Sequence, residues 1–350
     1  MNYARNQIQN MQGYTPGEQP RSLDVVKLNT NENPYPPSPA VARALAEFDP
    51  ENLRRYPDPV ATELRDLGAE LNGLPGRNWV LAGNGSDDLL TMALRTFADA
   101  GTAVAYPWPT YSLYPVLCDI QGARKIEIQL DSEFNLPSDF LQQASSANLL
   151  FIARPNAPTG NTFSMTEMRK VCAEFDGIVW IDEAYADFAD DNCMKLVTEF
   201  DNVVVSRTLS KSASLAGLRL GLAFANPAII NEMMKVKDSY NVSMLTQELA
   251  KASLRDVEYT NNLVREIRTV RSMTSESLAE LGFEVLPSQA NFLFVRPPAG
   301  NASNYVEHLR ANNVLVRYFP EERTRDFVRI TIGTPEQMKR LLDVTKDYDG

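Results

Sequence analysis

The sequence predicts an α/β fold with a largely parallel central sheet, and two observations support this prediction. Short apolar or β-branched runs alternate along the chain with amphipathic helical stretches, which is the pattern of strands joined by crossover helices. The chain has 350 residues, 44% of them hydrophobic. It exceeds the usual size of a single core, so we expect a second, smaller domain beside the sheet.

The large domain is expected to alternate helices with strands. Apolar side chains recur on one helical face at residues 87–98, and a second helical pattern covers residues 166–175. Short apolar runs predict strands at residues 103–106, 125–128, 149–153, 178–181, 203–206 and 220–225. Strands separated by helices in this way pair in parallel.

A different pattern begins after residue 260. A long charged helix starts at about residue 261, and the chain beyond it predicts strands at 283–286, 291–295, 314–317 and 327–332, with helices at 304–312 and from Pro335. Near the other end, the proline-rich residues 33–39 exclude helix and central strand and indicate an extended connector. We therefore expect an N-terminal arm and connector at 1–37, a large domain at 38–260 and a small α+β domain at 261–350.

The composition narrows the function. The chain carries 34 Lys and Arg against 45 Asp and Glu, a net charge of −11, whereas a nucleic-acid-binding protein needs a basic footprint. No apolar run approaches the roughly 20 residues that span a bilayer, and the polar N-terminus lacks a secretory apolar segment. We expect a cytoplasmic protein that binds neither nucleic acid nor membrane.

The scarcity of histidine and cysteine excludes several kinds of catalytic site. His308 is the single histidine, so sites with paired histidine ligands are impossible. Cys118, Cys172 and Cys193 form no CxxC pair, which argues against a disulfide scaffold and a zinc site. We expect no metal, and catalysis must use Lys, Asp, Tyr, Ser or Arg, or a cofactor.

Polar side chains follow three successive expected strands. Asn156 follows the first, Asp182 and Tyr185 follow the second, and Lys211 follows the third. In open α/β sheets the ligand binds outside the carboxyl ends of the strands. We therefore expect these four side chains to share one crevice.

These residue types together favour the chemistry of pyridoxal 5'-phosphate. A lysine amine forms a Schiff base with the cofactor aldehyde, and a carboxylate keeps the pyridine nitrogen protonated so that the ring accepts electrons. Lys211 and Asp182 are the natural candidates for these two tasks. Asn156 and Tyr185 are then expected to hydrogen-bond the ring hydroxyl.

The cofactor phosphate needs donors of its own. Gly85, Ser86 and Asp87 stand at the start of a predicted helix, where free backbone N–H groups and the helix dipole favour an anion. The side chains expected to complete this phosphate cradle are those of Thr208, Ser210 and Arg219.

Several motifs carry a resemblance to a known family. The segments 156–160 and 182–185, together with Ser210-Lys211 and the segment 217–221, resemble the signature of fold-type I, aspartate-aminotransferase-like pyridoxal phosphate enzymes. The more discriminating segments are 28–34, 55–57 and 329–334. They are similar to those of the histidinol-phosphate aminotransferases. The resemblance covers nearly the whole chain and implies a central sheet sandwiched by helices.

The resemblance implies roles for individual residues around the cofactor. Lys211 would hold the cofactor and move a proton between the substrate Cα and the cofactor, and Tyr111 would stack on the pyridine ring. Tyr56 would reach the cofactor phosphate of a neighbouring subunit. This last role implies a homodimer with the site at the subunit interface.

The resemblance also implies the substrates. Arg329 is similar to the arginine that grips the substrate acid group, and Arg317 to a second anion-binding arginine, since a guanidinium group matches both carboxylate and phosphate. Tyr14 resembles a tyrosine of an arm that closes over the substrate, and Asn33 lies in a motif on the substrate side. The implied reaction exchanges an amino group between L-histidinol phosphate and 2-oxoglutarate, a step of histidine biosynthesis that yields imidazole acetol phosphate and L-glutamate.

Other functions stay open at this point. An aromatic amino acid aminotransferase or a threonine-phosphate-type decarboxylase would use the same Lys211, Asp182 and Asn156. The segments 212–215 and 316–319 depart from the pattern of the family, so they leave the substrate undecided. A non-catalytic binding protein is disfavoured because Lys211 and Asp182 are both present, and a Rossmann dehydrogenase because 83–85 lacks the third glycine of GxGxxG.

Overall fold

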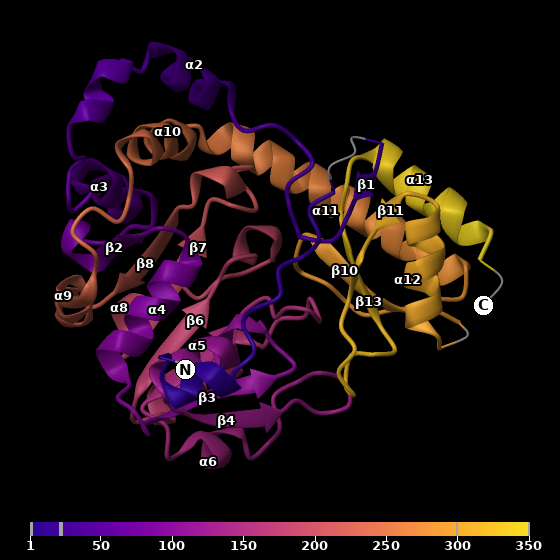
Figure 1. The fold of residues 1–350 in the computed structure, drawn as a ribbon, viewed down its shortest axis with the longest axis horizontal. Coiled ribbons are helices and arrows are strands. Elements are labelled where there is room, and N and C mark those ends of the chain that lie inside the picture. Colours follow the sequence, from indigo (N-terminus) through magenta and orange to yellow (C-terminus); the bar gives the residue numbers. More distant parts are fainter. Residues whose placement is uncertain (1–2, 21–23, 299, 349–350) are drawn as a thin grey trace.

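Within the described residues, 3–20, 24–298 and 300–348, a seven-stranded sheet forms the centre of the larger of two lobes in this computed structural model (Figure 1). In spatial order its strands are β2 (Val80–Gly83), β8 (Gly221–Ala225), β7 (Val203–Thr208), β6 (Ile178–Asp182), β5 (Leu149–Ala153), β3 (Ala103–Trp108) and β4 (Arg124–Gln129). β8 runs antiparallel to both of its neighbours, and the strands from β7 to β4 pair in parallel. The predicted mainly parallel sheet is confirmed, and β2 adds a strand that the sequence pattern did not indicate.

Helices cover both faces of this sheet because its strands are apolar on both sides. All residues of β2, β5 and β8 are buried, as expected of strands that lie between two layers. One face packs against α4 (Ser86–Phe97), α5 (Leu113–Gln121) and α9 (Pro227–Val236). The other packs against α3 (Thr62–Leu71), α6 (Phe140–Ala144), α7 (Met165–Glu174), α8 (Leu196–Glu199) and α10 (Met244–Arg255).

The predicted connector is extended up to the start of α2 (Pro39–Glu47). Ser38 accepts a hydrogen bond from the backbone N–H of Ala40, and Pro39 occupies the first helical turn, where its missing N–H costs nothing. Short 3-10 helices complete the connections of the large lobe, namely η1 (Pro50–Arg54), η2 (Arg77–Trp79), η3 (Ala186–Phe188) and η4 (Ala216–Leu218).

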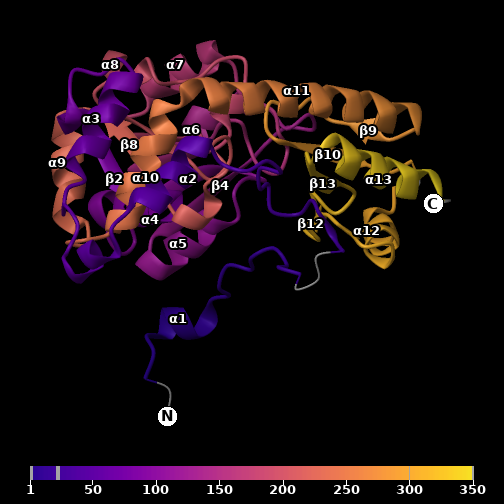
Figure 2. The same ribbon diagram turned by 90° about the horizontal axis from the view of Figure 1, so that it is seen from above.

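The N-terminal arm lies outside the large lobe and contains α1 (Asn6–Asn10), as Figure 2 shows. Arg5 donates a hydrogen bond to the main-chain oxygen of Ile120 at 2.9 Å, and the Gln7 amide donates to that of Asp119. Both acceptors belong to the end of α5. These contacts attach the arm to the large lobe before it reaches the space between the lobes.

The smaller lobe holds an antiparallel sheet in the order β12-β13-β10-β9. Its elements are α11 (Val257–Glu280), β9 (Glu284–Val285), β10 (Phe292–Arg296), α12 (Ala302–Ala311), β12 (Arg317–Tyr318), β13 (Val328–Thr331) and α13 (Pro335–Lys346). The prediction of a single strand at 314–317 is wrong. The chain instead forms β11 (Val314–Leu315), which pairs in parallel with β1 (Val26–Lys27) of the N-terminal segment, and then β12 in the other sheet.

We propose domain boundaries near residues 37 and 260, as the sequence suggests. A separate apolar core joins Leu28 to Ile267, Tyr305 and Leu341, which supports a small domain that also takes in β1. α11 begins at Val257 and runs from the large lobe over the small one, along the upper edge of Figure 2. Residues 1–2, 21–23, 299 and 349–350 of the proposed domains lie outside the described part of the chain. Among the helices of the described part, none is long and apolar enough to cross a membrane.

Candidate active site

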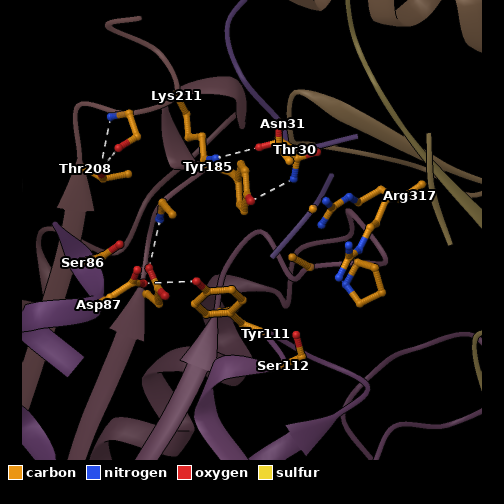
Figure 3. Close-up of a pocket in the computed structure, with 18 of the residues that line it drawn as sticks. Thr30, Asn31, Ser86, Asp87, Tyr111, Ser112, Tyr185, Thr208, Lys211 and Arg317 are labelled. Atoms are coloured by element: carbon orange, nitrogen blue, oxygen red, sulfur yellow. Dashed lines mark hydrogen bonds between the residues drawn. The ribbon is translucent and has the colours of Figure 1, made fainter. Parts of the chain in front are cut away.

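A cavity opens where the carboxyl ends of β5, β6 and β7 face the small lobe (Figure 3). The parallel register aligns Ala153 with Asp182 and Asp182 with Ser206, so the three strands end side by side. Most of the residues predicted from the sequence line this cavity, namely Tyr14, Ser86, Asp87, Tyr111, Asp182, Tyr185, Thr208, Ser210, Lys211, Arg219, Arg317 and Arg329.

Asp182 lies at the floor of the cavity, held by three donors. The Tyr114 hydroxyl donates to its Oδ2 at 3.0 Å, and the Ser206 hydroxyl and the Ala184 N–H donate to its Oδ1 at 3.4 and 3.3 Å. Burial raises the pKa of the Asp182 carboxyl to about 6, although these hydrogen bonds act in the opposite direction. The carboxylate is therefore fixed in place but remains ionised at neutral pH.

Lys211 reaches across the cavity from the loop after β7. Its Nζ donates to the main-chain oxygen of Thr30 at 3.2 Å and lies 5.8 Å from the centre of the Tyr185 ring (Figure 3). Burial, and next the nearby charge of Arg329, lower the pKa of the Lys211 amine to about 8. A substantial fraction of this amine is neutral, and thus nucleophilic, near physiological pH.

The start of α4 forms a cradle that suits a phosphate group. Gly85, at φ +88°, is the N-cap of α4 and supplies no capping side chain, so the first N–H groups of the helix stay free for an anion. A Cβ at Gly85 would lie 2.5 Å from the Arg219 guanidinium, and one at Gly221 would lie 2.8 Å from the Ser86 nitrogen. Both positions therefore need glycine, because the helix start, β8 and Arg219 meet there without space for a side chain.

Hydroxyl groups of the loop after β7 continue the cradle. The Ser210 N–H donates to the Thr208 Oγ1 at 3.2 Å, and the two hydroxyl oxygens lie 2.9 Å apart. Arg219 forms an ion pair with Asp87 at 3.4 Å across the same space. The predicted phosphate-binding residues thus converge around the start of α4.

Two tyrosines close the cavity on the side of the arm. The Tyr111 hydroxyl donates to Asp87 Oδ1 at 3.1 Å, and its ring meets the ring of Tyr14 edge to face, with centroids 6.0 Å apart. Burial raises the pKa of both phenols. Tyr14 therefore approaches the cavity through an aromatic contact, as the sequence suggests, and Tyr111 presents its ring above the floor that Asp182 forms.

Arg317 and Arg329 stand at the opposite end of the cavity from the phosphate cradle. Arg317 donates to the main-chain oxygens of Thr15 and Pro16 at 2.9 and 3.3 Å, and Arg329 donates to that of Asn29 at 3.0 Å. The buried Nε of Arg329 has no hydrogen-bond partner. Such an unused donor on a buried cation fits an anionic ligand.

Four of the predicted residues are not among those that line the cavity of this chain. The Asn33 amide donates to the main-chain oxygens of Lys211 and Ser212 at 2.9 and 3.1 Å, so it supports the lysine loop from behind. Both N–H donors of the Asn156 amide are used within the protein, by the Pro109 main-chain oxygen and the Thr159 hydroxyl, and its Oδ1 accepts from Thr110.

The other two are Gly85 and Tyr56. Gly85 lies behind Arg219 and acts through its backbone. Tyr56 is 77% exposed and stacks on Tyr240 with ring centroids 4.4 Å apart. It does not line the cavity of its own chain.

Several residues of the site were not predicted from the sequence. Asn31 donates to the Tyr185 hydroxyl at 2.9 Å, and Tyr114 and Ser206 hold Asp182. Phe319 lines the cavity between the two arginines. Tyr114 lies in the first turn of α5, and its ring meets that of Tyr111 edge to face with centroids 5.6 Å apart.

Comparisons with known proteins agree with this geometry. The sequence profile described as "Aminotransferase class I and II" matches residues 23–344. The chain is 43% identical to histidinol-phosphate aminotransferase 1 of Trichormus variabilis over 99% of both chains. It is 46% identical to the histidinol-phosphate aminotransferase of Synechocystis over 97% of this chain and 96% of the relative.

A solved structure shares the same fold. Histidinol-phosphate aminotransferase from Sinorhizobium meliloti, in complex with pyridoxal-5'-phosphate, superimposes with a TM-score of 0.90 at 21% identity, over 99% of this chain and 98% of that one. At this low sequence identity, the similarity supports the fold alone. The family rests on the sequence profile and on the two relatives named above. The chain belongs to the class I and II aminotransferases and, within them, to the histidinol-phosphate aminotransferase family.

Proposed function

We propose that this enzyme transfers the amino group between L-histidinol phosphate and 2-oxoglutarate, with pyridoxal 5'-phosphate as its cofactor. The observation that carries the proposal is one cavity with two anion-binding ends. The phosphate cradle beside Lys211 and Asp182 suits the cofactor, and the pair Arg317 and Arg329 suits the acid group of a substrate. The relatives named for this activity extend over nearly the whole chain.

The residues present fit the cofactor. The close approach at Gly85 and Gly221 leaves the start of α4 open to a phosphate, and Asp182 is positioned to accept a hydrogen bond from a protonated pyridine nitrogen. When bound, pyridoxal phosphate supplies an aldehyde carbon and a ring that takes up electrons. Tyr111, Tyr185, Thr208, Ser210 and Arg219 would hold its ring and phosphate, and we retain Asn156 as a supporting residue of the wall.

Lys211 performs the proton transfer in this proposal. Because its pKa is about 8, the neutral amine can take a proton from the substrate Cα and transfer it to the cofactor. Arg329 and Arg317 bind the acid groups of donor and acceptor in turn, and Tyr14 covers the bound substrate. The arm and the arginines thereby exclude water from the reacting carbon.

A homodimer completes the proposed site. Tyr56 does not line the cavity of its own chain, and it is exposed, as are the large apolar side chains of Leu45, Leu53 and its stacking partner Tyr240. Exposed apolar groups that gather on one side of a protein commonly mark an interface. We propose that Tyr56 reaches the cofactor phosphate of the neighbouring subunit. We also propose a cytoplasmic location, which the buried free cysteines support, since they need no oxidising compartment.

A donor comparison tests the proposal. The purified enzyme is supplied with pyridoxal phosphate and 2-oxoglutarate, and glutamate formation is measured with L-histidinol phosphate or L-phenylalanine as donor. We expect kcat/KM to be about 100-fold higher for histidinol phosphate, because its phosphate dianion can accept from both arginines, whereas phenylalanine offers one singly charged carboxylate. Lys211→Ala should abolish transfer from both donors without unfolding the protein.

The possible results separate the candidate activities. A preference for phenylalanine would make the enzyme an aromatic aminotransferase. Release of CO₂ from L-threonine phosphate without glutamate formation would make it a decarboxylase. Full activity in Lys211→Ala would exclude the proposed role of the lysine.

A further inference from the structure

The antiparallel pair β12 and β13 brings two cations face to face at the cavity. Arg317 and Arg329 occupy directly opposite positions of this pair. Like charges at such positions repel and destabilise a sheet unless another group compensates. In the described part of the chain, the hydrogen-bond acceptors of both guanidinium groups are main-chain oxygens, so no carboxylate neutralises them by a direct hydrogen bond.

One aromatic ring contacts both cations. The guanidinium carbon of Arg317 lies 5.5 Å from the centroid of the Phe319 ring, and that of Arg329 lies 5.3 Å from it. A cation within about 6 Å of a ring is attracted by the negative charge of the ring face. Phe319 therefore offsets part of the repulsion and fixes where the two charged groups stand.

Arg329 is enclosed from a second side. Its guanidinium carbon also lies 5.3 Å from the centroid of the Phe292 ring, which is fully buried. Burial, and then the charge of Arg317, lower the pKa of Arg329. The result is a desolvated cation with an unused Nε donor, next to a second cation on a shared ring. The two cations therefore need negative charge from a ligand, and a doubly charged anion neutralises them better than a singly charged one.

We propose that Phe319 is a specificity-determining residue that holds Arg317 and Arg329 together as one receptor for the phosphate dianion of the amino donor. The inference rests on the proposed function and adds a residue to it. A phosphate group can accept from both guanidinium groups at once, whereas a carboxylate brings one charge and two oxygens. Loss of the ring should therefore penalise the phosphorylated donor more than L-glutamate.

Three variants test the proposal. Phe319→Leu keeps an apolar side chain but removes the aromatic face, and Phe319→Tyr keeps that face. Tyr318→Leu is the matched control, because Tyr318 ends β12 directly before Phe319 and packs against the core of the small lobe. All three are compared with the unaltered holoenzyme, with L-histidinol phosphate and with L-glutamate as donor.

The expected result is a selective change in KM. In Phe319→Leu, KM for L-histidinol phosphate should rise about tenfold, with kcat changed less than about twofold and KM for L-glutamate less than about threefold. Phe319→Tyr should restore the KM of the unaltered enzyme. An equal rise for both donors, an unchanged KM, or the same selective rise in Tyr318→Leu would each overturn the proposal.

Binding of inorganic phosphate separates this inference from the proposed function. Calorimetric titration of phosphate into the holoenzyme should show about tenfold weaker binding in Phe319→Leu than in the unaltered enzyme or in Tyr318→Leu. If histidinol phosphate proves not to be a donor but phosphate binding still weakens, the proposed function fails and the role of the ring remains. Equal phosphate affinity in Phe319→Leu and the unaltered enzyme would refute the role of the ring whatever the substrate.

Discussion

Burial shifts the pKa values of Asp182 and Lys211, the two ionisable residues that face the proposed cofactor, in opposite directions. The pKa of Asp182 rises to about 6 and that of Lys211 falls to about 8, because burial penalises the charged form of each. Near pH 7 to 8 the carboxylate is charged while the amine begins to lose its proton. A fixed negative charge and a base of moderate strength are the two groups that the proposed transfer needs.

The buried carboxylate is expected to reduce stability above pH 6. Its pKa is about 6 in the folded chain against a model value of 3.8, so between these values the folded protein binds a proton that the unfolded chain does not. Stability is therefore lost as the pH rises through this window. Without cofactor, Asp182→Asn should be about 1–3 kcal/mol more stable than the unaltered protein at pH 8, with little difference at pH 4.

Urea unfolding at the two pH values measures this difference. Asp99→Asn, at an exposed position, controls for the removal of one carboxylate. A lower free energy of unfolding for Asp182→Asn at pH 8 would show that the hydrogen bonds from Tyr114 and Ser206 outweigh the cost of burial.

The same substitution should have the opposite effect on catalysis. An amide cannot keep a positive charge on the pyridine nitrogen, so Asp182→Asn should lower kcat by about 100-fold or more with the cofactor bound. Steady-state glutamate formation measures the loss. A rate near that of the unaltered enzyme would mean that another group protonates the ring.

Among the elements, the N-terminal arm depends on one glycine for its closed position. A Cβ on Gly17 would overlap the methyl group of Thr30, whereas one on Gly13 would meet nothing within 4 Å. Gly17→Ala should therefore lift the arm and separate Tyr14 from Tyr111. The loss of this aromatic contact predicts a rise of about fivefold in KM for the amino donor, with little change in melting temperature.

Limited proteolysis and steady-state kinetics check this prediction together. Gly17→Ala should be cut faster within the arm than the unaltered enzyme, and Gly13→Ala should behave like the unaltered enzyme in both assays. Equal cleavage rates and equal KM values in all three proteins would show that the arm does not cover the substrate.

The sequence predicts the central elements better than the peripheral ones. β5, β6 and β7 are continuous apolar runs that end in polar residues, so local pattern was sufficient for them. The error at 314–317 has a physical cause, because Val314 pairs with Val26 and Arg317 pairs with Arg329. No local pattern can show that two halves of one apolar run join different sheets.

The same reason separates the predicted from the missed residues of the site. Lys211, Asp182 and Arg219 each belong to a short motif of neighbouring residues, so the sequence alone was sufficient to predict them. Asn31 contacts Tyr185, which is distant in the sequence. Phe319 meets Arg329 only because β12 pairs with β13, so the folded chain is needed to show either contact. Asn156 was expected in the cavity, but its amide already has partners on three sides.

At the scale of the whole molecule, the proposed dimer makes each site depend on two chains. Tyr56→Ala and Lys211→Ala would then impair different halves of a shared site. If the two variants are unfolded and refolded together, mixed dimers should contain one intact site. Recovered activity should reach about a quarter of that of the unaltered enzyme, since half of the dimers are mixed and each has one working site.

Activity of the mixture supplies the test. Refolding each variant alone is the control, and size-exclusion chromatography gives the oligomeric state. A mixture no more active than the average of its components would show that Tyr56 does not serve a neighbouring subunit.

The parallel pair of β1 with β11 has a consequence for how the protein is made. Val26 leaves the ribosome long before its partner Val314 is made. The strands of the large sheet lie between them and can pair while synthesis continues. The segment that contains Val26 must therefore stay unpaired until Val314 has been made, and the pocket that it helps to enclose forms after the large sheet.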